Sequence, residues 1–153
     1  MPADVYREQI TRYAQLLNLD TERSPDHPEL VQLSVTRLPP PILVYFTERE
    51  NPLLSKGMQV MVAQFVIHLA LTQTMVRGFI EKSRDIATCW GVAVEVRDAP
   101  ESMTNLEPLA EYHADLRVTL PARSVDLETF AWLVNQMVCA YVDLMGTPVK
   151  PRA

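Results

Sequence analysis

Three histidines are the residues of this chain best suited to acid–base or metal chemistry: His27, His68 and His113. None has a cysteine, histidine or aspartate at the spacing of zinc ligands, although His113 and Asp115 fall on the same face of a predicted strand. Solvent-exposed positions account for His27 and His113. His68 fits either the solvent-exposed side of its element or a hydrogen-bonded position in the core. The sequence therefore predicts no metal site.

Nucleophilic catalysis has no recognisable motif in the chain. Cys89 and Cys139 have no histidine nearby in the sequence to activate them, and no Gly-x-Ser-x-Gly motif is present. Small buried cysteines are the simpler interpretation. The four glycines, at positions 57, 78, 91 and 146, are too far apart for a dinucleotide fingerprint or a phosphate-binding loop. We therefore expect no cofactor, and no catalytic residue can be named.

Acidic residues are scattered along the chain. Any two carboxylates that meet in a cleft can act as acid and base, but the sequence gives no reason to select a pair. The net charge of −5 argues against binding to nucleic acid, because a grip on phosphates needs clustered lysines and arginines.

The chain carries no sign of export or of membrane insertion. Its first residues lack a basic region followed by an apolar run, so we expect neither a signal peptide nor a transit peptide. The most apolar stretch, Met58 to Leu71, is interrupted by Gln64 and His68 and is shorter than the roughly 20 residues of a membrane helix. Two cysteines do not make a disulfide framework. We expect a soluble, cytoplasmic protein.

Size and composition indicate one folded domain. The chain has 153 residues, of which 48% are apolar and 22% charged, values typical of globular proteins. We expect a single α+β domain over residues 1–153, with a short tail at residues 146–153. Its sheet is predicted to be antiparallel, with four or five strands packed by three helices.

The first half begins with a clear helix and two strands. Apolar residues recur at helical spacing from residue 4 to 17. Residues 18–29 have no periodicity and are predicted to be a loop. A strand is expected over residues 30–37, where apolar and polar residues alternate, and a second over residues 42–47. The prolines at 39–41 give a stiff connection between them.

The region from Gly57 to Trp90 has two interpretations. Polar residues that include Gln64 and His68 recur at steps of three to five, which favours a helix broken near residues 72–74 or at Gly78. The alternative is a strand over Met58–Leu69 followed by a helix, because many of its residues are β-formers.

The last third contains two strand signals and the clearest helix. Alternating residues predict strands over 92–97 and 113–120, joined by a polar connection with one helical turn near residues 103–106. The final helix is predicted to start at Ser124 as N-cap and to end at Gly146. Its apolar face is formed by Phe130, Leu133, Val134, Met137, Tyr141 and Leu144.

These C-terminal elements resemble the end of the YbjN family, which is similar in fold to type III secretion chaperones. The likeness rests on residues 91–145, where a final strand leads through a short turn into a helix. That helix opens with an acidic residue and a Phe-x-x-hydrophobic-hydrophobic pattern, matched by Glu128, Phe130, Leu133 and Val134. The resemblance implies small acidic dimers that hold extended segments of partner proteins without a cofactor. The family order is helix, three strands, helix, two strands, helix.

The sequence therefore favours a non-enzymatic protein-binding module, chaperone-like or adaptor, which holds a segment of an unidentified partner protein on apolar patches. Methionines on predicted helix faces can adapt to varied apolar partners. Two alternatives stay open: a small enzyme or ligand-binding domain whose pocket is not visible in the sequence, and a structural subunit of a larger assembly. We also expect a homodimer, since a helical Met58–Trp90 segment carries more apolar surface than one sheet covers. The predicted interface or partner-binding residues are Met58, Met61, Phe65, Leu69, Met75, Val76 and Phe79.

Overall fold

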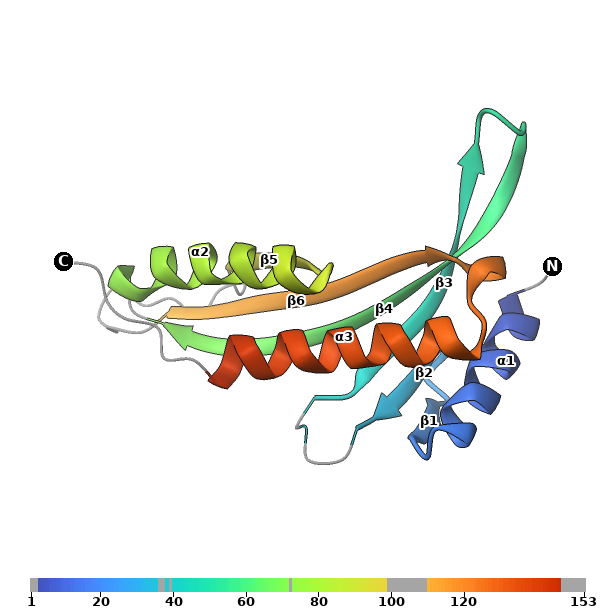
Figure 1. Cartoon of the computed structure of the whole chain (residues 1–153), viewed down its shortest axis with the longest axis horizontal. Coiled ribbons are helices and arrows are strands. Elements are labelled where there is room, and N and C mark those ends of the chain that lie inside the picture. The colour runs from blue at the N-terminus through green and yellow to red at the C-terminus, as the bar shows by residue number, and fades with distance from the viewer. Residues whose placement is uncertain (1–2, 36–37, 39, 72, 99–109, 147–153) are drawn as a thin grey trace. The chain divides into compact units, whose positions relative to one another are not determined.

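The computed structural model describes residues 3–35, 38, 40–71, 73–98 and 110–146. The elements, shown in Figure 1, are α1 (Ala3–Leu16), β1 (Asp20–Ser24), β2 (His27–Ser34), β3 (Ile42–Asn51), β4 (Lys56–Leu71), α2 (Gln73–Trp90), β5 (Ala93–Asp98), β6 (Ala110–Pro121), the 3-10 helix η1 (Ala122–Ser124) and α3 (Leu127–Gly146). The strands form one antiparallel sheet in the order β1-β2-β3-β4-β6-β5. The predicted α+β class is confirmed, with six strands in place of four or five.

The chain divides into two compact units. The first comprises residues 1–64 and 118–134, and the second comprises residues 65–117 and 135–153. Helix α1 and strands β1–β3 lie wholly in the first unit, and α2 and β5 lie wholly in the second. The elements β4, β6 and α3 continue from one unit into the other.

In the first unit, an antiparallel meander is packed by α1. Buried residues alternate along the strands, as at Val31 and Leu33 of β2, which places one set of side chains in the core. Aromatic pairs connect α1 to its neighbours: Tyr6 stacks on Phe46 of β3 with ring centroids 5.7 Å apart, and Tyr13 lies 6.0 Å from Phe130 of α3.

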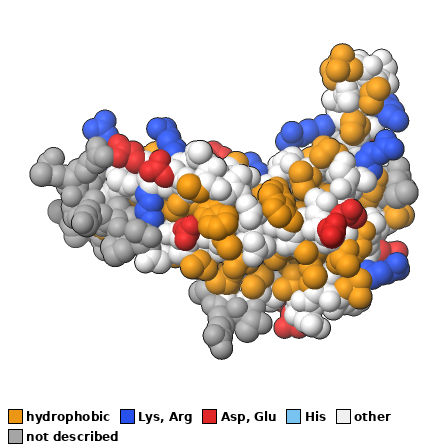
Figure 2. All heavy atoms as spheres, in the orientation of Figure 1, with side chains coloured by type: hydrophobic (Ala, Val, Ile, Leu, Met, Phe, Trp, Pro, Cys, Tyr) orange, Lys and Arg blue, Asp and Glu red, His pale blue; other side chains and the backbone are white. Residues whose placement is uncertain are grey.

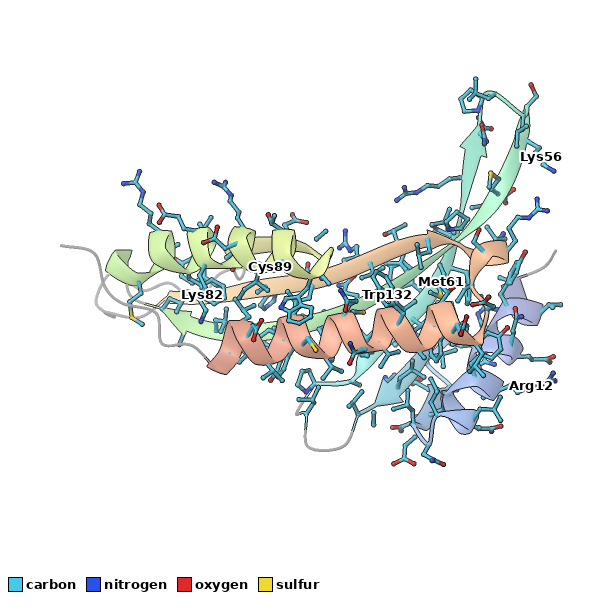
Figure 3. The ribbon with its side chains drawn as sticks, viewed as in Figure 1. Arg12, Lys56, Met61, Lys82, Cys89 and Trp132 are labelled. Carbon is cyan, nitrogen blue, oxygen red and sulfur yellow. The ribbon has the colours of Figure 1, made fainter. Side chains whose placement is uncertain are left out.

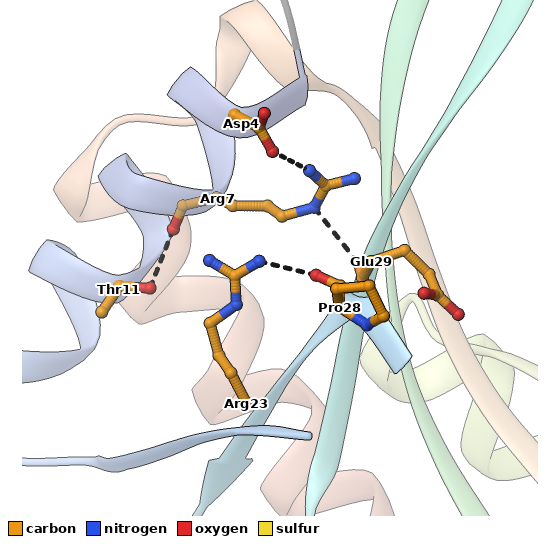
Figure 4. A network of polar contacts seen from close by, with 6 residues as sticks. All are labelled: Asp4, Arg7, Thr11, Arg23, Pro28 and Glu29. Atoms are coloured by element: carbon orange, nitrogen blue, oxygen red, sulfur yellow. Dashed lines mark hydrogen bonds and ion pairs between the residues drawn. The ribbon is translucent and has the colours of Figure 1, made fainter. Parts of the chain in front are cut away.

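A polar network also fixes α1 against the strands (Figure 4). Arg7 forms an ion pair with Asp4 on the same helix, and its Nε donates to the carbonyl of Glu29 in β2 at 3.3 Å. Arg23 of β1 donates to the carbonyl of Pro28 at 2.6 Å. These bonds tie α1 and the edge of the sheet together near its first two strands.

The second unit packs α2 and the C-terminal part of α3 with β5, β6 and the end of β4. Phe65 of β4 is fully buried and faces Tyr141 of α3 at 5.3 Å between ring centroids. Lys82 of α2 donates to the carbonyl of Leu144 at 2.6 Å. Burial lowers the pKa of Lys82, and the nearby Asp143 carboxylate partly opposes that shift.

Two sequence predictions about these elements are wrong. Residues 18–29 were expected to be a loop but contain β1 and the start of β2. The favoured helix from Gly57 is wrong over its first half, since β4 is a strand, and the alternative of a strand followed by a helix is confirmed. A polar step of four, as from Gln64 to His68, fits a helix face, but on a strand of period two it also falls on one face.

The ends of the helices follow local chemistry. Helix α2 ends before Gly91, whose φ of 65° is left-handed, in agreement with the sequence prediction. Helix α3 begins later than predicted: Ser124 lies in η1, and the side chain of Asp126 accepts the backbone N–H of Thr129 at 2.8 Å. Asp126 is therefore the N-cap. The helical turn expected near residues 103–106 and the tail from 147 lie outside the described residues.

Candidate functional site

The most unusual surface of the chain belongs to α3. Successive side chains of a helix point about 100° apart, so a 20-residue helix has side chains in every direction around its axis. The inner face is the one expected from the sequence, and all six of its predicted residues are buried. The remaining positions were not assigned to any face by the sequence, yet most of them are apolar as well.

We define the α3 outer face as the exposed or half-buried apolar side chains of this helix that lie outside the inner face. Its members are Leu127, Ala131, Trp132, Val138, Cys139, Val142 and Met145. Trp132 is 53% exposed, Val142 51% and Met145 43%. Glu128 and Asp143 are the only charged residues of the helix. Hydrophobic side chains accordingly gather on the surface over α3 in Figure 2.

In the second unit, Trp90 of α2 is hydrogen-bonded to two polar residues of α3. Its indole N–H donates to Asp143 at 2.5 Å, and its backbone carbonyl accepts the side-chain amide of Gln136 at 3.0 Å. These two bonds reach α3 seven residues apart, so Trp90 as a whole is anchored over about two turns of the helix. Trp90 is itself half-buried, and Cys139 lies between its two polar partners in the sequence.

In the first unit, the N-terminal part of α3 presents Trp132 (Figure 3). Glu128, Thr129 and Trp132 line a shallow cavity of about 410 Å³. The hydrogen bonds from Thr129 hold the pKa of Asp126 below its ordinary value, so the cap is ionised at neutral pH. A capped helix start keeps the Trp132 turn in a defined position.

The interface residues predicted from the sequence lie in the core or at its margin. Met61 and Phe65 are fully buried, and Phe79 is 2% exposed, so the chain itself covers all three. The other four are half-buried: Met58, Leu69, Met75 and Val76. The structure brings none of the seven onto the α3 outer face, because they belong to β4 and α2.

A polar cluster on the second unit was not foreseen. His68 of β4 and His113 of β6 meet edge to face with ring centroids 4.4 Å apart, although they are distant in the sequence. Asp115 is buried, and its carboxylate lies 3.9 Å from the guanidinium of Arg117. Within the described ranges, no group of three or more His, Cys, Asp and Glu side chains is arranged to hold a metal ion.

The periodicity of α3 predicts its buried face but does not show that apolar residues extend beyond it. The signal that identifies the outer face is the near absence of charge from residue 127 to 146, since a helix with one solvated side normally has an apolar stripe and a charged stripe.

Among the helices in the described part of the chain, none is long and apolar enough to cross a membrane.

Comparisons with known proteins give little further guidance. No protein-family model matches the chain, and no curated protein matches it. A solved structure described as an uncharacterized protein from Methanothermobacter thermautotrophicus is similar to it with a TM-score of 0.46. The alignment covers 92% of this chain and 94% of that one at 9% sequence identity. A likeness at this level carries no conclusion about family or function.

Proposed function

We propose that this protein is a non-enzymatic binding module, chaperone-like or adaptor, that holds an apolar segment of a partner protein on the α3 outer face. The observation that carries the proposal is that apolar side chains of α3 extend beyond its buried face and stay exposed or half-buried in the described structure. A surface helix normally turns polar and charged residues to solvent. A partner supplies the missing cover.

The energetics favour a partner at this surface. Burying a large apolar side chain is worth roughly 1.5–3 kcal/mol relative to leaving it exposed. Trp132, Val142 and Met145 each keep about half of that surface in water. Contiguous exposed apolar patches are typical of interaction sites, whereas singly scattered apolar residues are ordinary.

The dimensions and charge of the face suit a segment with basic flanks. A helix of 20 residues is about 30 Å long and about 10 Å wide, so α3 offers roughly 300 Å². A standard interface needs about 800 Å² per partner, which makes a short docked segment a better fit than a large rigid surface. Since α3 has no lysine or arginine, positive residues on the partner meet no repulsion from it.

The resemblance to the YbjN family and to secretion chaperones belongs to this proposal, as does a cytoplasmic location. The element order here is helix, four strands, helix, two strands, helix, which differs from the family order by the added edge strand β1. The free thiols of Cys89, which is exposed, and Cys139 suit a reducing compartment.

Site-specific photo-crosslinking in host cell extract tests the proposal. A photoreactive amino acid replaces Val142 on the outer face and, as the control, Arg84, which is exposed on α2 in the same unit. We expect one adduct from position 142 and none from position 84. Adding Met145→Glu should abolish the adduct at 142, because a carboxylate would then face the apolar segment.

Three results would count against the proposal. They are adducts of equal yield at both positions, no adduct at position 142, and an adduct that survives Met145→Glu. An adduct formed by the purified protein alone, at twice 17.4 kDa, would instead assign the face to a second copy of this chain.

A further inference from the structure

A cavity of about 580 Å³ lies in the first unit. Tyr6 of α1, Glu48 of β3 and Arg123 of η1 contribute to its lining, together with the first residues of β4, which are Lys56, Gly57, Met58 and Gln59. Figure 3 shows Lys56 on the β3–β4 hairpin. Ligand pockets commonly have volumes of about 300–1,000 Å³.

The walls of this cavity are fixed by their own packing. The ring of Tyr6 is stacked on Phe46 at an interplanar angle of 23°. The Asn51 side-chain amide donates to the sulfur of Met58 at 3.3 Å. An aromatic face and a thioether are therefore held beside the polar groups of the cavity, which reduces the ordering cost of binding.

Gly57 has a specific role in this wall. Cross-strand pairing places Glu48 opposite Gln59, and the Glu48 side chain leans diagonally over Gly57. A Cβ at position 57 would collide with the Glu48 carboxylate, so only glycine allows the carboxylate to lie there. The cavity thereby keeps one hydrogen-bond acceptor in its wall.

In the regions that the structure describes, Lys56, Arg123 and Glu48 form no ion pair. Two cations and one carboxylate give the cavity a positive balance on a chain whose net charge is −5. Both cationic side chains are exposed, so an entering anion meets little desolvation cost at them.

We propose that this cavity binds a small organic anion that also carries an amine or hydroxyl donor. A phosphate or carboxylate group lies between Lys56 and Arg123, where charge-assisted hydrogen bonds are strongest. The donor of the ligand faces Glu48, and its apolar part lies against Tyr6 and Met58. This site does not depend on the proposed partner surface. It corresponds to the alternative of a small-ligand-binding domain.

Three probes separate these contributions in NMR titrations at low salt. Inorganic phosphate and malonate compare the two anion chemistries, and phosphoethanolamine adds an amine to a phosphate. We expect shifts confined to the cavity residues at millimolar concentration, because so few atoms limit the affinity. Lys56→Gln and Arg123→Gln should each weaken binding about tenfold. Arg12→Gln is the matched control, an exposed arginine of α1 in the same unit but outside the cavity.

Glu48→Gln gives the most specific result, because its sign differs between probes. Removing this carboxylate should strengthen the binding of inorganic phosphate about threefold, since a like charge is lost. The same change should weaken the binding of phosphoethanolamine relative to that of inorganic phosphate, since the amine loses an acceptor. Far-ultraviolet circular dichroism confirms that each variant is folded.

The proposal is overturned if none of the three probes shifts the cavity residues at millimolar concentration. It is equally overturned if Arg12→Gln weakens binding as much as Arg123→Gln does, because binding would then follow net charge alone. If Glu48→Gln leaves the ratio of the affinities for the two phosphate probes unchanged, the carboxylate does not accept from the ligand, and the proposed amine or hydroxyl donor is overturned.

Discussion

Replacement of Phe65 distinguishes a core position from a subunit interface. The sequence placed this residue on a predicted interface, whereas the structure buries it completely against Tyr141 in the second unit. The informative changes are Phe65→Leu, which keeps most of the apolar volume, Phe65→Ala, which removes it, and Phe65→Glu, which puts a charge in the same place.

The expected magnitudes follow from these contacts. Phe65→Ala loses the buried ring and leaves a cavity, at a cost of about 3–5 kcal/mol. Phe65→Leu loses chiefly the aromatic pairing with Tyr141, which is worth about 0.5–1.5 kcal/mol beyond the area buried. Because a domain is stable by only about 5–15 kcal/mol, Phe65→Ala removes a large share and Phe65→Glu should unfold the protein.

Urea unfolding, followed by circular dichroism, measures these differences. A double-mutant cycle with Tyr141→Leu isolates the ring pair and should show a coupling of about 1 kcal/mol. The reasoning is refuted if Phe65→Ala costs less than about 1 kcal/mol. It is also refuted if Phe65→Glu stays folded while the mass in light scattering is halved, since Phe65 would then lie between subunits.

Three further predictions concern local structure and assembly. The hydrogen bonds from Thr129 lower the folded-state pKa of Asp126, so this carboxylate stabilises the fold above its unfolded pKa and ceases to do so as pH falls through the folded value. Asp126→Ala should therefore lower the urea midpoint at neutral pH but not at the acid limit. Gly91→Ala should cost about 1–2 kcal/mol in urea unfolding, since φ is 65° there and an added Cβ meets no atom, and Gly91→Asn should cost less. The homodimer stays a prediction, although its argument from a helical Met58–Trp90 segment does not hold where that segment is strand β4; light scattering at micromolar concentration should give twice 17.4 kDa for a dimer, and a mass of 17.4 kDa would contradict it.

Much of the fold could be predicted where one face of a helix or strand is exposed to solvent and the other is buried. Alternation over β2 and β6 and the helical spacing in α1 gave their types and approximate bounds. Strand β4 was harder because several side chains on both its faces are covered, including Val62 at 3% exposure and Met61 at 0%. A strand apolar on both faces has no period of two, which is the same difficulty that buried strands present in general.

Edge strand β1 could not be predicted for the opposite reason. Its residues, from Asp20 to Ser24, are all polar and none is buried, so no hydrophobic period exists to reveal it. Pairing with β2 holds it in place, through a register that joins Thr21 to Leu33 and shifts between Glu22 and Ser24. The meeting of His68 with His113 has the same origin, since it depends on strand pairing that no local pattern encodes.

The two proposed sites differ in the sequence information that could predict them, which is local for the outer face of α3 and long-range for the cavity. The outer face of α3 depends on one helix, so the near absence of charge from residue 127 to 146 is a local signal for it. The cavity beside the β3–β4 hairpin brings Tyr6, Lys56 and Arg123 together from three distant parts of the chain. Isolated charges at such separations predict nothing by themselves. The strand register that sets Glu48 beside Gly57 adds a carboxylate to a lining whose other charged residues, Lys56 and Arg123, are both cationic.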